Sequence, residues 1–272
     1  MSIEETKQIL RNYRIYPNKL LGQNFMVESS FYPKMCTYAA LTNLDTVLDA
    51  GAGFGFLTCF LADKCRAVVA VEKDPQVAKV LREETKSLDN VTVIEGDILK
   101  VTLPDFNKVI AIPPYYLSSK LILWFLERKV ECAVLIVQKE FATRLVAPIG
   151  SEEYSWLTVA TYPKVQVELL DAVPKEMFYP QPEVDSIIIR LKPWGITPFK
   201  VNDEMFFRRM VKWLFTERNK KLQNAITPFV KSTLKLSEQE VKKTVSSFSF
   251  ARMRVREMTP ENFGALANAL SN

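Results

Sequence analysis

Short apolar segments that alternate with helical patterns constrain the fold of this chain more than any other feature of its sequence. The apolar segments cover residues 46–50, 67–71, 91–95, 108–112 and 132–137. Stretches with helical spacing, such as residues 75–86 and 118–129, lie between them. Consecutive parallel strands need a crossover, usually a helix, so the alternation predicts a parallel sheet covered by helices on both faces.

Two further β-rich segments, residues 165–173 and 184–191, follow with no long helix directly between them. We expect antiparallel strands here, which completes a seven-stranded, mostly parallel sheet of the α/β class. Residues 192–198 are punctuated by proline and glycine and predict a linker. The sequence therefore divides into a sheet domain, 1–194, and a small α-helical domain, 195–272.

The smaller domain combines helical patterns with an excess of positive charge. Helical spacing covers residues 204–215, and further helices are expected to start at Ser237 and Thr259. Residues 195–272 contain 14 lysines and arginines against 7 acids, whereas the rest of the chain has 22 against 24. This asymmetry favours a polyanionic partner. A solvated helical surface is the alternative, and charge alone does not separate the two.

Histidine and several functional sequence patterns are missing from the sequence. There is no histidine, and none of the four cysteines has C-x-x-C spacing. Histidine-based catalytic triads are thereby excluded, and no metal site is expected. Dispersed cysteines are typical of free thiols in a cytoplasmic protein. No apolar stretch approaches the roughly 18–20 residues of a membrane span, and the N-terminus does not resemble a secretory signal.

A glycine-rich turn follows the first apolar segment. Gly51, Gly53 and Gly55 precede a helical pattern, an arrangement that lets a ligand approach the backbone closely. The spacing is not the G-x-G-x-x-G of dinucleotide sites, and no Walker lysine follows, so phosphate binding is disfavoured. Taken alone, the turn is a weak signal that fits several nucleotide-binding folds, and a glycine turn that binds no ligand is the alternative.

Acidic residues end the next two predicted strands. Glu72 lies 21 residues after Gly51, where a carboxylate accepts hydrogen bonds from two ribose hydroxyls. Asp97 is placed to accept from an adenine amino group, although alone it is equally an ordinary turn acid. Asp74, before Pro75, is expected to cap a helix. Together, the three strand ends resemble motifs I, II and III of the Rossmann-like S-adenosylmethionine (SAM)-dependent methyltransferases.

A proline-rich segment, residues 111–116, follows the fourth predicted strand. It resembles the Asn-Pro-Pro-Tyr or Asn-Leu-Pro-Tyr signature of methyltransferases that act on the amino groups of adenine and cytosine. Prolines stiffen such a loop and present backbone carbonyls, and a tyrosine offers a stacking face for an extruded base. The alternative is a proline-rich loop with surface tyrosines.

Four further segments carry a more specific resemblance. Residues 17–26 resemble a Lys-x-x-Gly-Gln-Asn-Phe-Leu element that helps close over SAM, and residues 137–144 resemble a Gln-Lys-Glu-x-Ala-x-Arg segment. Residues 178–186 resemble a Phe-x-Pro-x-Pro-x-Val-x-Ser loop, and residues 215–225 a Phe-x-x-Arg-Arg-Lys-x-Leu-x-Asn helix. All four belong to the ribosomal RNA adenine N6,N6-dimethyltransferases of the small subunit. The resemblance is collinear from about residue 15 to 226 and weaker beyond.

The resemblance implies roles for individual residues. It assigns to the cofactor SAM Gln23, Asn24, Met26, Gly51, Gly53, Glu72, Lys73, Asp97, Ile98 and Ile112. It places at the catalytic site Ile112, Pro113, Pro114, Tyr115 and Phe178, with Tyr115 stacking on the target adenine. It implies that rRNA phosphates are bound by Arg208, Arg209, Lys212, Arg218, Lys220 and Lys221.

One departure from the family lies at Ile112, where the family has asparagine. The resemblance implies SAM-dependent N6,N6-dimethylation of two adjacent adenosines in small-subunit rRNA, by a cytoplasmic monomer that acts on immature small subunits. Ile112 favours one alternative, a non-catalytic rRNA-binding assembly factor of the same fold. A second alternative is an N6-adenine DNA methyltransferase, against which the basic helical domain argues.

Overall fold

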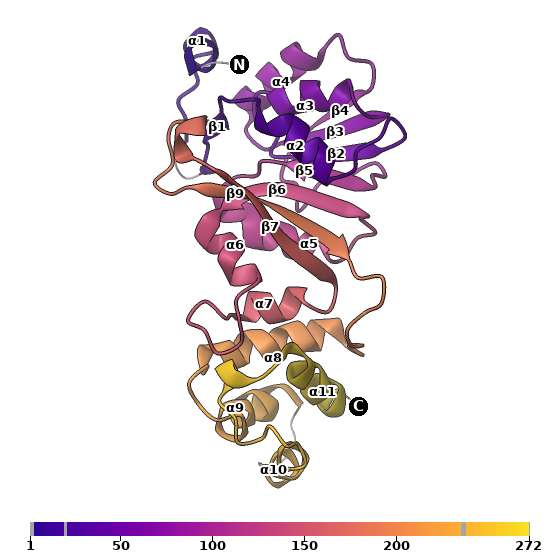
Figure 1. Cartoon of the computed structure of the whole chain (residues 1–272), viewed down its shortest axis with the longest axis vertical. Helices are drawn as coiled ribbons and strands as arrows, with labels where there is room; N and C mark the ends of the chain where they lie inside the picture. Colours follow the sequence, from indigo (N-terminus) through magenta and orange to yellow (C-terminus); the bar gives the residue numbers. More distant parts are fainter. Residues whose placement is uncertain (1–2, 19–20, 235–237, 272) are drawn as a thin grey trace. The chain divides into compact units, whose positions relative to one another are not determined.

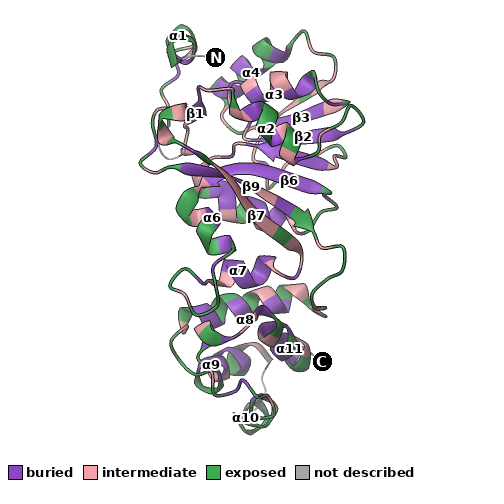
Figure 2. Cartoon of the chain, viewed as in Figure 1, coloured by how far each residue is buried: buried purple, intermediate pink, exposed green. Residues whose placement is uncertain are grey.

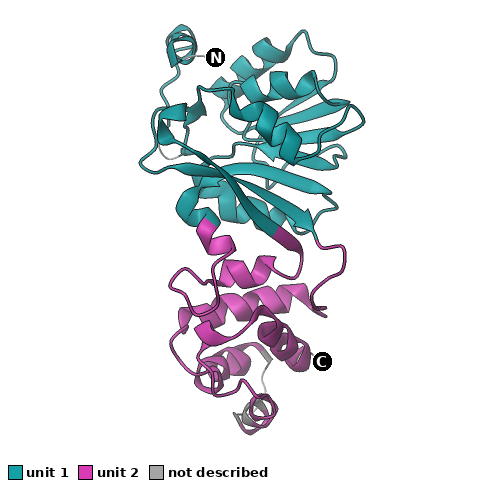
Figure 3. Ribbon diagram, viewed as in Figure 1, with its two compact units in different colours: residues 1–142, 167–193 teal, residues 143–166, 194–272 magenta. Residues whose placement is uncertain are grey.

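The computed structural model describes residues 3–18, 21–234 and 238–271. The helix start predicted at Ser237 lies outside these ranges, as do residues 19 and 20 of the N-terminal segment. Two compact units are present (Figure 3). One comprises Met1–Ala142 with Val167–Pro193, and the other Thr143–Gln166 with Trp194–Asn272.

The second unit differs from the predicted small domain because it also contains residues 143–166. Tyr154 and Val159, from this segment, share one hydrophobic core with Met210 of the C-terminal part. The Tyr154 hydroxyl also donates to the Met258 carbonyl at 2.8 Å. The predicted linker nevertheless coincides with the point where the chain returns to this unit, at Trp194.

A seven-stranded sheet forms the centre of the first unit (Figure 1). Its strands are β2 (Thr46–Ala50), β3 (Ala67–Glu72), β4 (Val91–Glu95), β5 (Lys108–Ala111), β6 (Cys132–Gln138), β7 (Val165–Val173) and β9 (Ser186–Pro193). The order is β4-β3-β2-β5-β6-β9-β7. The first five strands in this order, β4, β3, β2, β5 and β6, pair in parallel, and β9 pairs antiparallel with β6. This confirms the predicted sheet.

Burial of the central strands explains why they were recognisable as apolar segments. Every residue of β2 and β5 is buried, and β6 is buried up to its last residue (Figure 2). Strands covered on both faces need apolar side chains at successive positions rather than at alternate ones. The order of strands places β2, with its glycine turn, between β3 and β5.

Except for the first, which precedes every strand, the helices of the first unit lie between strands. They are α1 (Ile3–Asn12), α2 (Phe31–Tyr38), α3 (Phe56–Ala62), α4 (Pro75–Thr85), α5 (Ser118–Phe125) and the start of α6 (Lys139–Leu145). Asp74 caps α4 as predicted, since its carboxylate accepts from the Gln76 N–H at 2.9 Å. Pro75 occupies the first turn, where the missing N–H costs nothing.

A second, two-stranded sheet was not expected from the sequence. Strand β1 (Phe25–Met26) pairs antiparallel with β8 (Phe178–Tyr179), which follows the short 3-10 helix η3 (Lys175–Met177). In the register, Met26 lies opposite Phe178. The pairing joins the N-terminal segment to the loop that carries Phe178.

The second unit is helical. Its helices are α7 (Trp156–Thr161), α8 (Glu204–Thr216), α9 (Leu222–Leu234), α10 (Glu238–Ser246) and α11 (Pro260–Leu270), with the 3-10 turn η4 (Val255–Glu257). Phe207, Met210 and Leu214 of α8 are buried in its core. Across the described ranges of both units, no helix is long and apolar enough to cross a membrane.

Candidate functional site

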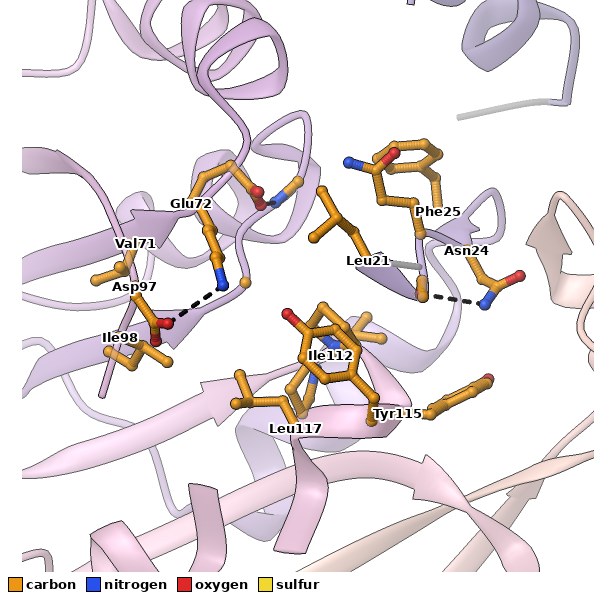
Figure 4. Close-up of a pocket in the computed structure, with 18 of the residues that line it drawn as sticks. Leu21, Asn24, Phe25, Val71, Glu72, Asp97, Ile98, Ile112, Tyr115 and Leu117 are labelled. Atoms are coloured by element: carbon orange, nitrogen blue, oxygen red, sulfur yellow. Dashed lines mark hydrogen bonds and ion pairs between the residues drawn. The ribbon is translucent and has the colours of Figure 1, made fainter. Parts of the chain in front are cut away.

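A cavity that opens to solvent lies at the carboxyl ends of β2, β3, β4 and β5 in the first unit, with about 760 Å³ of empty space that includes part of the open solvent. This is the place where parallel α/β sheets bind ligands. Most of the predicted cofactor and catalytic residues line it: Gln23, Asn24, Gly51, Gly53, Glu72, Lys73, Asp97, Ile98, Ile112, Pro113, Pro114, Tyr115 and Phe178. Figure 4 shows Glu72 and Asp97 on one side, and Asn24 and Tyr115 on the other.

Met26 is the one predicted cofactor residue that does not line this cavity. It lines a smaller cavity, with about 390 Å³ of empty space that includes part of the open solvent, together with Asp49. Asn24, Gly51 and Ile112 line both cavities, so the two adjoin. Ile112 therefore stands where the two cavities meet.

The glycine turn and the proline loop line the same wall of the cavity and lie in close contact. A Cβ atom on Gly51 would lie 2.8 Å from Cδ of Pro114, and its φ of +82° also favours glycine. The loop at Pro113–Pro114 thus closes against the turn at a distance that only glycine permits. We call this wall, formed by Gly51, Gly53, Pro113 and Pro114, the glycine cradle.

Glu72 ends β3 and holds the glycine turn in place. Its Oε2 accepts from the Gly53 N–H at 3.0 Å, and its Oε1 accepts from the Asp74 N–H at 2.9 Å. Burial raises the pKa of the Glu72 carboxyl, while these N–H groups act in the opposite direction. Each carboxylate oxygen has a second lone pair, so the side chain can also accept from hydroxyl groups in the cavity.

Asp97 and Lys73 form an ion pair at the same edge of the cavity, with 3.2 Å between Asp97 Oδ2 and Lys73 Nζ. Asp97 Oδ1 accepts from the Leu99 N–H at 3.1 Å. Burial opposes ionisation of Asp97, but this N–H and Lys73 outweigh it, so the pKa of Asp97 lies below its ordinary value. The carboxylate stays charged and available as an acceptor.

Gln23 anchors the N-terminal segment over the cavity. Its amide donates to Asp74 Oδ2 at 2.8 Å and accepts from the Asn18 N–H at 2.8 Å. Both ends of the amide are therefore engaged within the protein, and its predicted contact with a cofactor stays a prediction. Asn24 donates to the Gly22 carbonyl at 3.2 Å, which turns its amide oxygen away from that carbonyl.

Aromatic side chains define the other side of the cavity. The Tyr115 hydroxyl shares a 2.7 Å hydrogen bond with the fully buried Ser186 hydroxyl, which fixes the ring. Tyr115 and Phe178 meet edge to face, with 6.5 Å between ring centres and a 70° angle between planes. Ile112, which precedes them, offers no side-chain acceptor to a ligand.

Asp49, in the smaller cavity, is a buried carboxyl with only 1% of its surface exposed. It accepts a 2.7 Å hydrogen bond from the Thr58 hydroxyl. Burial raises the pKa of Asp49 to about 7, and nearby Glu72 adds to the rise, although Thr58 opposes it. In the native protein the carboxyl therefore keeps its proton up to near neutral pH.

We expect Asp49→Asn to stabilise the protein at about pH 8 by on the order of 2–4 kcal/mol, with little effect near pH 4. Between the unfolded and folded pKa values, only the native state binds this proton, so wild-type stability falls as pH rises to about 7. The amide still accepts from Thr58 but has no charge to bury. Urea unfolding of both proteins at the two pH values tests this, and an equal difference at both would contradict it.

The family of this chain follows from comparison with known proteins. A family model described as ribosomal RNA adenine dimethylase matches residues 16–268. The chain belongs to the ribosomal RNA adenine dimethylase family. It is accordingly a SAM-dependent rRNA adenine methyltransferase. The match reaches further toward the C-terminus than the resemblance in the sequence, which weakens beyond about residue 226.

Individual relatives agree with this assignment. A probable ribosomal RNA small subunit methyltransferase A of Methanosarcina acetivorans is 38% identical over 266 residues, which is 97% of each chain. The ribosomal RNA small subunit methyltransferase A of Halothermothrix orenii is 34% identical over 278 residues, covering 97% of this chain and 92% of the relative.

Solved structures share the fold of this adenine dimethylase family member. A dimethyladenosine transferase from Plasmodium falciparum superposes with a TM-score of 0.75 at 24% identity, covering 89% of this chain and 95% of that one. The 23S rRNA methyltransferase ErmE gives a TM-score of 0.64 at 28% identity, covering 92% and 100%. The Rossmann-like methyltransferase fold predicted from the sequence is thereby confirmed.

The basic residues predicted for RNA binding fall into two sets in the second unit of the dimethylase. Arg208, Arg209 and Lys212 lie on α8, with Arg209 and Lys212 exposed. Lys212 Nζ also lies 5.6 Å from the centre of the Trp156 ring. These three cations occupy the part of α8 that does not face the core.

The second set lies in the turn after α8, and two of its residues bind other parts of the protein. The Arg218 guanidinium donates to the carbonyls of Ser151 and Glu152, both at 2.9 Å, which fixes that loop. Lys220 pairs with Glu217 at 2.9 Å. Arg218 is thus a structural residue of the second unit, and an additional contact of its guanidinium with RNA stays a prediction.

The structure adds basic residues that sequence reasoning missed. Lys221 and Arg254 form an antiparallel bridge between the turn after α8 and the segment before α11. The bridge brings Arg252, Arg254 and Arg256 next to Lys220 and Lys221. The sequence does indicate that these arginines are exposed. They alternate with apolar residues, which is typical of an extended segment with one exposed face.

The cavity also has lining residues that were not predicted. They come from the segments next to the recognised motifs: Leu21, Gly22, Phe25, Val71, Gly96, Tyr116 and Leu117. Most are apolar and carry no chemical signal of their own in the sequence. Within the described ranges, no group of three or more histidine, cysteine, aspartate or glutamate side chains could hold a metal ion.

Proposed function

We propose that this chain dimethylates the N6 amines of two adjacent adenosines in small-subunit rRNA, on immature subunits. The main support for the proposal is a single cavity lined on one side by carboxylates and glycines and on the other by aromatic rings. Carboxylates and a glycine cradle at successive strand ends suit a nucleoside cofactor. The edge-to-face pair of Tyr115 and Phe178 suits an extruded base.

The residues present fit the cofactor SAM. Glu72 would accept from ribose hydroxyls, Asp97 from the adenine amine, and the cradle at Gly51 would receive the chain that bears the sulfonium. SAM supplies a methyl group on that sulfonium. Asn24 and Met26 line the cavities from the N-terminal segment and would cover the same ligand.

The chain's own part in catalysis would be positioning. The N6 nitrogen of adenine is a weak nucleophile because its lone pair is delocalised into the ring. The backbone carbonyls of Ile112 and Pro113 would accept from the N6 amine, whereas the Pro114 carbonyl already accepts from the Leu117 N–H at 2.9 Å. Tyr115, fixed by Ser186, would hold the ring. Orientation and local dipoles of this kind supply much of an enzyme's rate acceleration.

The helical unit would bind rRNA through phosphate contacts. Arg209 and Lys212 on α8, and Lys221, Arg252 and Arg254 at the bridge, are exposed cations. Such contacts supply affinity and register, while the cavity selects the base. We propose that the protein acts as a monomer in the cytoplasm; its four cysteines are free thiols.

Reversing Arg208, Arg209 and Lys212 to glutamate should weaken binding to small subunits. The logarithmic salt dependence of binding should fall by roughly one slope unit for each phosphate that the variant no longer neutralises. SAM affinity should not change, because the three residues lie outside the unit that holds the cavity. A salt titration of subunit binding measures the effect.

A matched control reverses Lys79, Lys86 and Lys129, which are exposed in the first unit and alter the net charge equally. We expect this variant to keep the wild-type salt slope. Equal slopes for the wild type and the α8 variant would mean that the cations of α8 form only a solvated surface.

Transfer of tritiated methyl groups from SAM to unmethylated small subunits tests the proposed function. Incorporation at adenosine N6 in rRNA, with none in duplex DNA, is the expected result. Tight subunit binding without transfer would instead identify an assembly factor, the alternative that Ile112 favours. Transfer to duplex DNA would overturn the assignment of substrate.

A further inference from the structure

Tyr116 lines the cavity but has no part in the function described so far. It belongs to the 3-10 helix η2 (Tyr115–Leu117), directly after the proline loop. The residue is 45% exposed. Tyr115, its neighbour, is instead held by Ser186 on the opposite side of the loop.

One side of the Tyr116 ring packs on the N-terminal segment. A Cβ atom on Gly22 would lie 3.3 Å from Cδ1 of Tyr116, so the ring rests on the bare backbone of that glycine. Gly22 also lines the cavity and has a φ of +59°, a conformation that favours glycine. The segment itself is anchored by Gln23, which donates to Asp74.

Lys73 and Asp97 form an ion pair that lines the same cavity as Tyr116. Asp97 raises the pKa of the Lys73 ammonium most, through its hydrogen bond, and the Tyr116 phenol contributes to the same rise. Tyr116 therefore lies near enough to Lys73 to interact with it electrostatically. Tyr116 thus packs on Gly22 and lines the same cavity as the Lys73–Asp97 pair, where the adenine of the cofactor would lie.

We propose that Tyr116 is the residue that retains the adenosyl end of the cofactor, by covering it between Gly22 and Lys73. This inference rests on the proposed SAM site. Retention depends on the apolar ring rather than on the hydroxyl, since it is the ring that packs on Gly22. Its exposed face leaves room for the ring to swing outward, so it would set how fast the spent cofactor leaves.

The test measures release of S-adenosylhomocysteine, as labelled ligand, from the full chain. Tyr116→Ala should release it roughly tenfold faster, toward the low end of what removing an aromatic partner of a nucleobase costs. Tyr116→Phe keeps the ring and should stay within about threefold of wild type. In steady state, the alanine variant should raise KM for SAM without lowering kcat, and KM for rRNA should not change.

Tyr16 provides the control, because it is 87% exposed and does not line the cavity. Tyr16→Ala should release the ligand at the wild-type rate. Unchanged release from Tyr116→Ala would overturn the proposal, and a raised KM for rRNA in that variant would show that the ring contacts RNA instead. Failure of the wild type to bind S-adenosylhomocysteine would reject the SAM site itself, a different result.

Discussion

Ile112→Asn is expected to raise the rate of methyl transfer at least about tenfold, with little change in SAM affinity. The asparagine places a side-chain oxygen where the two cavities meet, within the group of acceptors around the target amine. Losing one positioned hydrogen bond to a reacting group typically costs about 10²–10³ in rate. The lower bound of the expected gain lies below that range because the backbone carbonyls of residues 112 and 113 would still act as acceptors.

Ile112→Val is the matched control, since it alters the same side chain without adding an acceptor. Ile112 packs partly against the core beneath the cavity, so both variants remove part of the same apolar packing. Single-turnover transfer to unmethylated subunits, with SAM binding measured separately, compares the three proteins. If asparagine and valine give the wild-type rate, the backbone carbonyls suffice and the side chain has no role.

Glu72→Ala should weaken SAM binding by about 1.5–3 kcal/mol, the usual cost of losing hydrogen bonds to a charged acceptor. The structure shows a second reason for a large effect. The same carboxylate accepts from the N–H groups of Gly53 and Asp74, so its removal also frees the glycine turn. Calorimetric titration with SAM measures the change in affinity.

Glu95→Ala is the control for this variant. Glu95 lies opposite Glu72 in the register of β3 and β4, but it pairs with Arg82 at 2.7 Å and does not line the cavity. Its removal should leave SAM affinity unchanged. Equal affinities for wild type and Glu72→Ala would reject Glu72 as the ribose acceptor.

The sheet and the acids at its edge can be predicted because each produces a recognisable pattern within a few consecutive residues. Buried parallel strands read as apolar segments, and Glu72 and Asp97 each follow one. The sheet of β1 and β8 left no such mark, since two-residue strands are too short to show a period. Gln23 and Arg218 were assigned to ligands, yet their partners within the protein lie about 50 to 70 residues away. No local pattern reveals contacts at that separation.

The origin of the second unit in two separate stretches has a consequence during synthesis. Tyr154 emerges from the ribosome 104 residues before Met258, the residue whose carbonyl it contacts. At translation rates of about 5–20 residues per second, that interval is roughly 5–20 s. During this time the core that Tyr154 and Val159 share with α8 and α11 is incomplete, while the strands on either side are already available for pairing. The core of the second unit therefore stays incomplete, with apolar residues exposed, until α11 has been synthesised.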